Sequence, residues 1–135
     1  MKARILTLLM IVGIGFLTSC NNNDDDSSQK KSINGTWYLT NVRGGLASIN
    51  NDYSKGDVKW TFNQTNAILT VENKIGNNNT FYLHSGTYSF NIEDDEETQI
   101  LFVDNNDYRM VILSIENSLI ITDDSNDGFT AEFKR

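Results

Sequence analysis

The side chains that could act in catalysis are few and scattered along the chain. The sequence has one histidine, His84, and no G-x-S-x-G nucleophile motif surrounds it. Three acidic pairs could in principle serve as general acid and base: Asp94-Asp95, Glu96-Glu97 and Asp123-Asp124. Adjacent carboxylates in polar turns are exposed and lack the apolar pocket that a catalytic acid requires. We therefore expect no enzymatic activity and interpret His84 as a surface or strand-end residue.

One spacing resembles the beginning of a calcium-binding loop, at Asp123, Ser125, Asp127 and Gly128. Such a loop needs a bidentate glutamate at its twelfth position, where this chain has Lys134. Asp-rich hairpin turns also occur commonly without a metal. We expect no metal ion here and no cofactor elsewhere in the chain.

The only cysteine, Cys20, ends a segment that follows the plan of a secretion signal. Lys2 and Arg4 supply the positive n-region, and residues 5–17 form an apolar core that is too short to span a bilayer comfortably. The alternative is a retained transmembrane helix with an incidental cysteine. It is disfavoured because the apolar run stops at Cys20 and turns at once to Asn and Asp.

The four residues Leu17-Thr18-Ser19-Cys20 resemble the lipobox of bacterial lipoproteins. The resemblance implies a lipoprotein signal peptide over residues 1–19 and a Cys20 that bears acyl chains such as palmitate. Each buried methylene would contribute about 0.8 kcal/mol, so two or three chains would anchor the protein to the membrane without spanning it. With Cys20 consumed, no thiol remains for a disulfide, a nucleophile or a zinc site.

Residues 21–32 contain no apolar side chain, so residues 20–32 are expected to be the lipidated cysteine and a flexible acidic tether. Within it, Asp24-Asp25-Asp26 resembles the acidic signal that Bacteroidota place after the lipidated cysteine to send lipoproteins to the cell surface. A merely solvated linker is the alternative. The expected location is the outer membrane, with the protein lipid-anchored on the periplasmic face or the cell surface.

The charge balance argues against nucleic acid as a partner. Lys2 and Arg4 are two of the 11 basic residues and none of the 18 acidic residues precedes Cys20, so the mature chain carries a net charge of about −9. A negative field of this size repels phosphate backbones.

Beyond Ser32 the hydrophobic pattern changes to period two, with Val58, Trp60 and Phe62 alternating with polar neighbours. Such alternation predicts half-buried strands, and turn signals separate them at short intervals. The predicted strands cover residues 36–43, 58–64, 67–73, 80–83, 86–92, 99–103, 109–116, 119–123 and 129–134. Residues 80–92 are alternatively one long strand bent at Gly86.

Short strands joined by tight turns predict an all-β fold: an antiparallel up-and-down meander of about eight strands, closed into a small barrel or strongly curled as a sandwich, over residues 33–135. Residues 46–53 are expected to form one short helix or an irregular lid. By alternation, the side chains expected to point inward are those of Trp37, Leu39, Val58, Trp60, Phe62, Leu69, Val71, Tyr88, Phe90, Ile92, Ile100, Phe102, Phe129, Ala131 and Phe133.

Gly35 and Trp37 resemble the G-x-W motif that opens the first strand of lipocalins and of the lipocalin-like domains of bacterial lipoproteins. The resemblance implies that Trp37 closes one end of the barrel and packs against a basic residue of the last strand, Arg135 or Lys134. Asn106-Asp107-Tyr108 is similar to the family's later T-D-Y motif, with Asn in place of Thr. Since about 100 residues is short for a lipocalin, we expect a shallower cup.

Two functions follow from this interpretation. In the first, a membrane-anchored lipocalin-like protein binds a small hydrophobic or amphipathic ligand in a pocket lined by Trp60, Phe62, Tyr88 and Phe90. In the second, the same aromatics plug the barrel, and the domain is a non-enzymatic interaction or structural module that contacts another envelope protein. An interior void favours the first function, and an exposed apolar patch around residues 46–53 favours the second.

Overall fold

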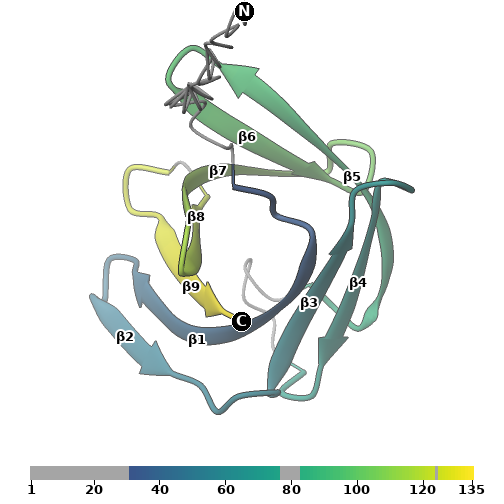
Figure 1. Cartoon of the computed structure of the whole chain (residues 1–135). Helices are drawn as coiled ribbons and strands as arrows, with labels where there is room; N and C mark the ends of the chain where they lie inside the picture. Colours follow the sequence, from purple (N-terminus) through teal and green to yellow (C-terminus); the bar gives the residue numbers. More distant parts are fainter. Residues whose placement is uncertain (1–30, 77–82, 124) are drawn as a thin grey trace, which may run out of the picture.

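The computed structural model describes residues 31–76, 83–123 and 125–135. The predicted signal peptide (residues 1–19) and Cys20 lie outside the described residues. Nine strands and no helix occur in the described part of the chain (Figure 1). The strands are β1 (Gly35–Gly44), β2 (Ile49–Asp52), β3 (Val58–Asn63), β4 (Ile68–Asn73), β5 (Gly86–Asp95), β6 (Thr98–Val103), β7 (Tyr108–Ile115), β8 (Ser118–Thr122) and β9 (Phe129–Lys134).

The strands form one antiparallel meander that closes into a barrel when β9 pairs with β1. The first half of β1 pairs with β3 and its second half pairs with β2. Between them the Tyr53 amide donates a hydrogen bond to the Thr40 carbonyl oxygen, 2.9 Å away. Strands β2 and β3 therefore lie end to end along one edge of β1, and the wall is eight strands around. The predicted all-β meander is confirmed, as a closed barrel rather than an open sandwich.

The prediction of a helix or lid over residues 46–53 is wrong, because β1 and β2 form a tight hairpin there. Gly44 has a φ of +124°, and a Cβ at this position would lie 2.2 Å from the Gly128 carbonyl oxygen. Only glycine permits this turn and this close approach of two backbones. The strand predicted at residues 80–83 lies mostly outside the described residues, and β5 begins at Gly86.

The barrel interior is filled by a single apolar cluster that includes four fully buried aromatic side chains, Trp37, Trp60, Phe62 and Phe133. The Trp60 ring lies 4.9 Å from Phe133 and 6.1 Å from Phe62, centroid to centroid. These separations are those of packed aromatic pairs. Tyr88, Ile92 and Phe129 are partly buried against the cluster. Side chains therefore fill the interior of this barrel, where a shallower cup was expected.

The predicted inward set is wrong in β6, where Leu101 and Val103 join the core in place of Ile100 and Phe102. The register aligns Leu101 with Met110, which is also a core residue, and Ile100 with Val111 on the other face. Four apolar residues follow one another in β6, so alternation alone could not decide which of them point inward.

Candidate binding cavity beside the N-terminal strap

The four residues before β1, residues 31–34, form a strap that is hydrogen-bonded to one end of the barrel. The Arg135 guanidinium donates from Nη2 to the carbonyl oxygens of Ser32, at 2.8 Å, and Asn34, at 3.2 Å. The Trp37 indole Nε1 donates to the Ile33 carbonyl oxygen at 2.7 Å. Ile33 itself is 1% exposed and belongs to the core. The strap is therefore held by both its backbone and a buried side chain.

Further contacts tie the strap to two hairpin turns at the same end. The Ser32 hydroxyl donates to Gln64 Oε1, and the backbone N–H of Gln64 donates to Asn34 Oδ1 at 3.0 Å. Lys31 Nζ lies 3.4 Å from Glu116 Oε1 in an exposed ion pair. Gln64 follows β3 and Glu116 follows β7, so the strap bridges opposite parts of the barrel wall.

The structure brings together Trp37 and Arg135, two of the residues predicted to close the barrel. The Arg135 guanidinium lies 4.2 Å above the centroid of the Trp37 ring, a cation–π contact on a fully buried indole. Gly35 begins β1 beside them with a φ of +108°. A residue with a Cβ would be strained in that conformation.

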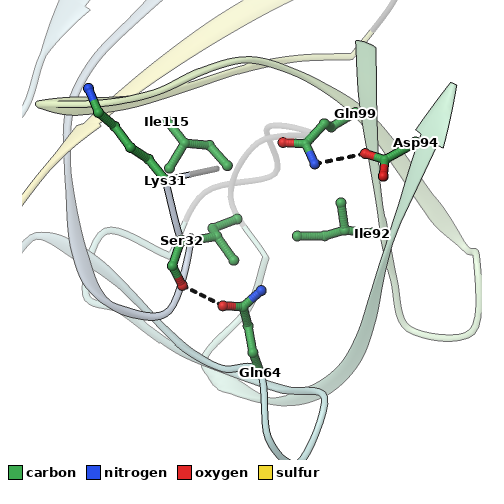
Figure 2. A pocket seen from close by; sticks show the side chains of 8 residues that line it. Lys31, Ser32, Gln64, Ile92, Asp94, Gln99 and Ile115 are labelled. Carbon is green, nitrogen blue, oxygen red and sulfur yellow. Dashed lines mark hydrogen bonds between the residues drawn. The ribbon is translucent and has the colours of Figure 1, made fainter. Parts of the chain in front are cut away.

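An open cavity of about 300 Å³ lies beside the strap. Its lining combines three isoleucines with polar side chains: Lys31, Ser32, Ile33, Gln64, Ile92, Asp94, Gln99 and Ile115. Figure 2 shows the polar groups of Ser32, Gln64, Gln99 and Asp94 around the opening, with Ile92 and Ile115 between them. The cavity is therefore amphipathic, with an isoleucine wall and an amide-rich rim.

The cavity exists because β5 changes partners along its length. Its first residues pair with β4, up to Ser89, and Phe90–Asp95 pair only with β6. The Phe90 amide donates to the Ala67 carbonyl oxygen in the β3–β4 turn at 3.0 Å, and beyond this bond the β5–β6 hairpin continues past that turn (Figure 1). A second cavity of about 210 Å³, lined by Gln64, Ala67, Phe90, Asn91 and Ile92, occupies the same separation.

Carboxylate groups lie along one side of this cavity. Asp94 lines it, and Gln99 Nε2 donates to Asp94 Oδ1 at 3.0 Å. All five acidic residues in the run 93–97, at the tip of the β5–β6 hairpin, are exposed, and the cavity lining also includes the cationic Lys31. An exposed cluster of carboxylates gives the rim a negative potential.

Of the four predicted ligand-binding residues, Trp60, Phe62 and Phe90 pack against one another inside the barrel. The Phe62 and Phe90 rings meet edge to face at 5.1 Å. None of the four lines the 300 Å³ cavity among the described residues, although Phe90 lines the second one. The Trp60 Nε1 donor is buried without a hydrogen-bond partner. Sequence reasoning missed Gln64, Gln99 and the isoleucines because nothing in the pattern places the strap beside β5.

Tyr88 packs partly buried against the core cluster and donates from its hydroxyl to the His84 carbonyl oxygen at 2.7 Å. Burial raises the pKa of the Tyr88 phenol, and nearby Tyr108 and Asp104 raise it further. His84 is exposed, and its backbone carbonyl is the group that Tyr88 contacts.

The segment that resembles the beginning of a calcium-binding loop forms the hydrogen-bonded turn between β8 and β9. Asp123 Oδ1 accepts hydrogen bonds from the backbone amides of Ser125, at 3.3 Å, and Phe129, at 3.1 Å. This carboxylate therefore caps the β8–β9 turn. Across the described ranges, no group of three or more His, Cys, Asp or Glu side chains is placed to hold a metal ion.

Comparison with protein-family models, with curated proteins and with solved structures found no match for this chain. Within residues 31–76, 83–123 and 125–135, no helix has the length and apolar character needed to cross a membrane. Function is therefore inferred from the strap and its cavity.

Proposed function

We propose that this chain is a lipid-anchored, lipocalin-like lipoprotein of the outer membrane that binds a small amphipathic ligand in the strap-end cavity. The observation that carries this proposal is the composition of that cavity, an isoleucine wall with amide and charged groups at its rim. Small-molecule sites typically combine an apolar lining with a few polar groups that orient the ligand. The proposed activity is binding without catalysis.

The lipocalin-like assignment is supported by three features of the barrel. They are the G-x-W residues Gly35 and Trp37, the Arg135 guanidinium on the Trp37 ring, and an eight-strand meander closed by β9 against β1. An eight-stranded barrel of this kind either fills with side chains or holds one small ligand.

The ligand is assigned to the cavity rather than to the barrel interior because Trp60, Phe62 and Phe133 already fill the interior. The 300 Å³ beside the strap is room for roughly ten non-hydrogen atoms, at the ~30 Å³ that each water occupies in the liquid. A chain of about eight carbons with one polar group matches that size.

The proposed anchor would bring this end of the barrel toward the membrane. Cys20 lies 11 residues before Lys31, which lines the cavity. At about 3.5 Å per residue, even a fully extended chain would reach no further than about 38 Å. The cavity would thus lie close to the bilayer from which an amphipathic molecule could enter it, whichever face of the membrane carries the protein.

Calorimetric titration with 1-octanol tests the binding proposal. The chain from residue 20 to 135, carrying Cys20→Ser to prevent lipidation, contains every described element. We expect saturable 1:1 binding, weakened about fivefold by Ile92→Gln because an apolar contact worth about 1 kcal/mol is lost. Leu46→Gln is the matched control, since Leu46 is 87% exposed on the β1–β2 turn. Absence of binding, or equal effects of the two substitutions, would contradict the proposal.

A second candidate is an interaction module that contacts another envelope protein. It is favoured by the filled interior and by exposed apolar side chains, Leu46 at 87% and Leu113 at 57%. Cross-linking in native envelopes tests it. Here Leu46→Gln or Leu113→Gln should abolish capture of one discrete partner while Ile92→Gln should not, which is the reverse of the ligand-binding result.

A further inference from the structure

We propose that the strap-end cavity takes an extended peptide, which adds to the open edge of β5 as a short strand and places one apolar side chain against the isoleucine wall. This inference rests on the proposed binding function and adds the chemical class of the ligand. It follows from the backbone groups of β5 at the point where that strand runs past its last partner on one side.

Two printed bonds show which backbone groups of β5 face each of its edges. The Phe90 N–H donates to the Ala67 carbonyl oxygen at 3.0 Å, on the side of β4. The Ser89 carbonyl oxygen instead accepts from the N–H of Asp104, which follows β6, at 2.9 Å. Because the backbone groups of successive residues alternate between the two edges of a strand, Ile92 directs its N–H and C=O to the same side as Phe90, away from β6.

The backbone of Ile92 faces an edge that is open. The register places Ile92 opposite Leu101 of β6, in a pair of the kind that exchanges no hydrogen bonds. On the other side, β4 pairs with β5 only as far as Ser89. Within the described ranges, neither the N–H nor the carbonyl oxygen of Ile92 has a hydrogen-bond partner.

One residue of an added antiparallel strand would satisfy both of these groups. Its N–H would donate to the Ile92 carbonyl oxygen, and its carbonyl oxygen would accept from the Ile92 N–H. Addition of an extended peptide to an exposed sheet edge is a recurring mode of peptide binding, in which these backbone bonds provide affinity and pockets for side chains provide specificity.

The space along this edge is open but narrow. Ile92 and Gln64 both line the 300 Å³ cavity and the 210 Å³ cavity, so empty volume separates β5 from the β3–β4 turn here. Figure 2 shows Ser32 and Gln64 across the opening from Ile92. Walls on both sides leave room for one chain, which favours an extended peptide over pairing with the edge of a second barrel.

The same register fixes where the side chain of the peptide residue would point. Residues directly opposite each other in an antiparallel pair have their side chains on the same face. The residue opposite Ile92 would therefore direct its side chain toward the wall of Ile33, Ile92 and Ile115. Room for roughly ten non-hydrogen atoms in the larger cavity is enough for one leucine residue.

The Gln64 side chain adds a further donor for the peptide backbone. Its Oε1 accepts from the Ser32 hydroxyl, which leaves the nitrogen of the same amide to donate to a peptide carbonyl oxygen (Figure 2). The site thus combines backbone pairing at Ile92 with an apolar pocket and one amide donor.

Hydrogen exchange followed by NMR tests the backbone pairing, on the chain from residue 20 to 135 with Cys20→Ser and with the peptide acetyl-Ala-Leu-Ala-amide as the probe. In the free chain the Ile92 N–H should exchange about tenfold faster than the Glu93 N–H, which is directed to β6. Saturating peptide should slow exchange at Ile92 about tenfold and leave Glu93 unchanged.

Two N-methylated forms of the peptide separate backbone pairing from apolar contact. Methylation of the leucine nitrogen removes the donor to the Ile92 carbonyl oxygen, so affinity should fall about fivefold, the value of one hydrogen bond. Methylation of the third residue's nitrogen is the matched control. That N–H points away from β5 in an extended peptide, so affinity should change less than about twofold.

The outcomes separate this inference from the proposed function. Equal effects of the two methylations, or no binding of the peptide while 1-octanol binds, would overturn peptide pairing and leave the binding function standing. Slow Ile92 exchange in the free chain that depends on protein concentration would assign the edge to a second copy of the chain, which also overturns the inference. Binding of neither 1-octanol nor the peptide would overturn both proposals.

Discussion

Replacing Arg135 with alanine should release the strap from the barrel. The substitution removes a cation–π contact on buried Trp37, worth about 1 kcal/mol, and two hydrogen bonds from a charged donor. Because both bonds lie at an exposed site, we count about 0.5 kcal/mol for each. The free energy of unfolding should therefore fall by about 2 kcal/mol. Arg135→Lys should lower the free energy of unfolding by about half as much, since a compact ammonium cannot lie flat on the Trp37 ring and reach both carbonyl oxygens at once.

Urea denaturation followed by tryptophan fluorescence and circular dichroism measures this loss. Lys134→Ala is the matched control, because it removes only a surface pair with Glu132 and should change stability by about 0.5 kcal/mol or less. Arg135→Ala should also speed hydrogen exchange at Trp37 Nε1, whose partner is the Ile33 carbonyl oxygen. An Arg135→Ala protein as stable as Lys134→Ala, with unchanged indole exchange, would refute the assignment of Arg135 as the group that holds the strap.

Three further predictions concern the barrel itself. Trp60→Ala should lower the free energy of unfolding by about 3–5 kcal/mol, through the void it leaves, and change octanol affinity in the folded protein less than twofold; a large affinity loss would place the ligand in the interior. Gly44→Ala should destabilise by about 2–3 kcal/mol in the same denaturation assay, because the new Cβ meets the Gly128 carbonyl oxygen at 2.2 Å, and a neutral result would contradict this close approach of the two backbones. The raised pKa of Tyr88 means that the unfolded chain releases this proton first, so stability should fall as pH rises above about 10, and Tyr88→Phe should remove that contribution to the pH profile.

The alternation of apolar and polar residues was enough to predict most of the strands. Eight of the nine predicted strands correspond to β1 and β3–β9, because in most of them one face packs on the core and the other meets solvent, whereas β6 has an unbroken apolar run. The strand β2 was not predicted because its sequence has no alternation of apolar and polar residues. Its sequence, Ile49–Asp52, has one apolar residue in four, and what makes it a strand is pairing with β1.

The candidate site was much less predictable than the fold. Its lining comes from the strap, the β3–β4 turn, the β5–β6 hairpin and the end of β7, which the barrel closure brings together. No local pattern marks Gln64 or Gln99, and the aromatics that the sequence favoured are core because their own volume fills the barrel. By contrast, the contact between Trp37 and Arg135 was expected from a family resemblance rather than from periodicity.

The most direct measurement is a 1-octanol titration of the isoleucine methyl groups by NMR, on the chain from residue 20 to 135 carrying Cys20→Ser. Binding in the strap-end cavity predicts saturable shifts at Ile33, Ile92 and Ile115 with little change at Ile121, which is buried in the core. Shifts centred on Ile121, or none at the three cavity isoleucines at saturating 1-octanol, would contradict a ligand site beside the strap.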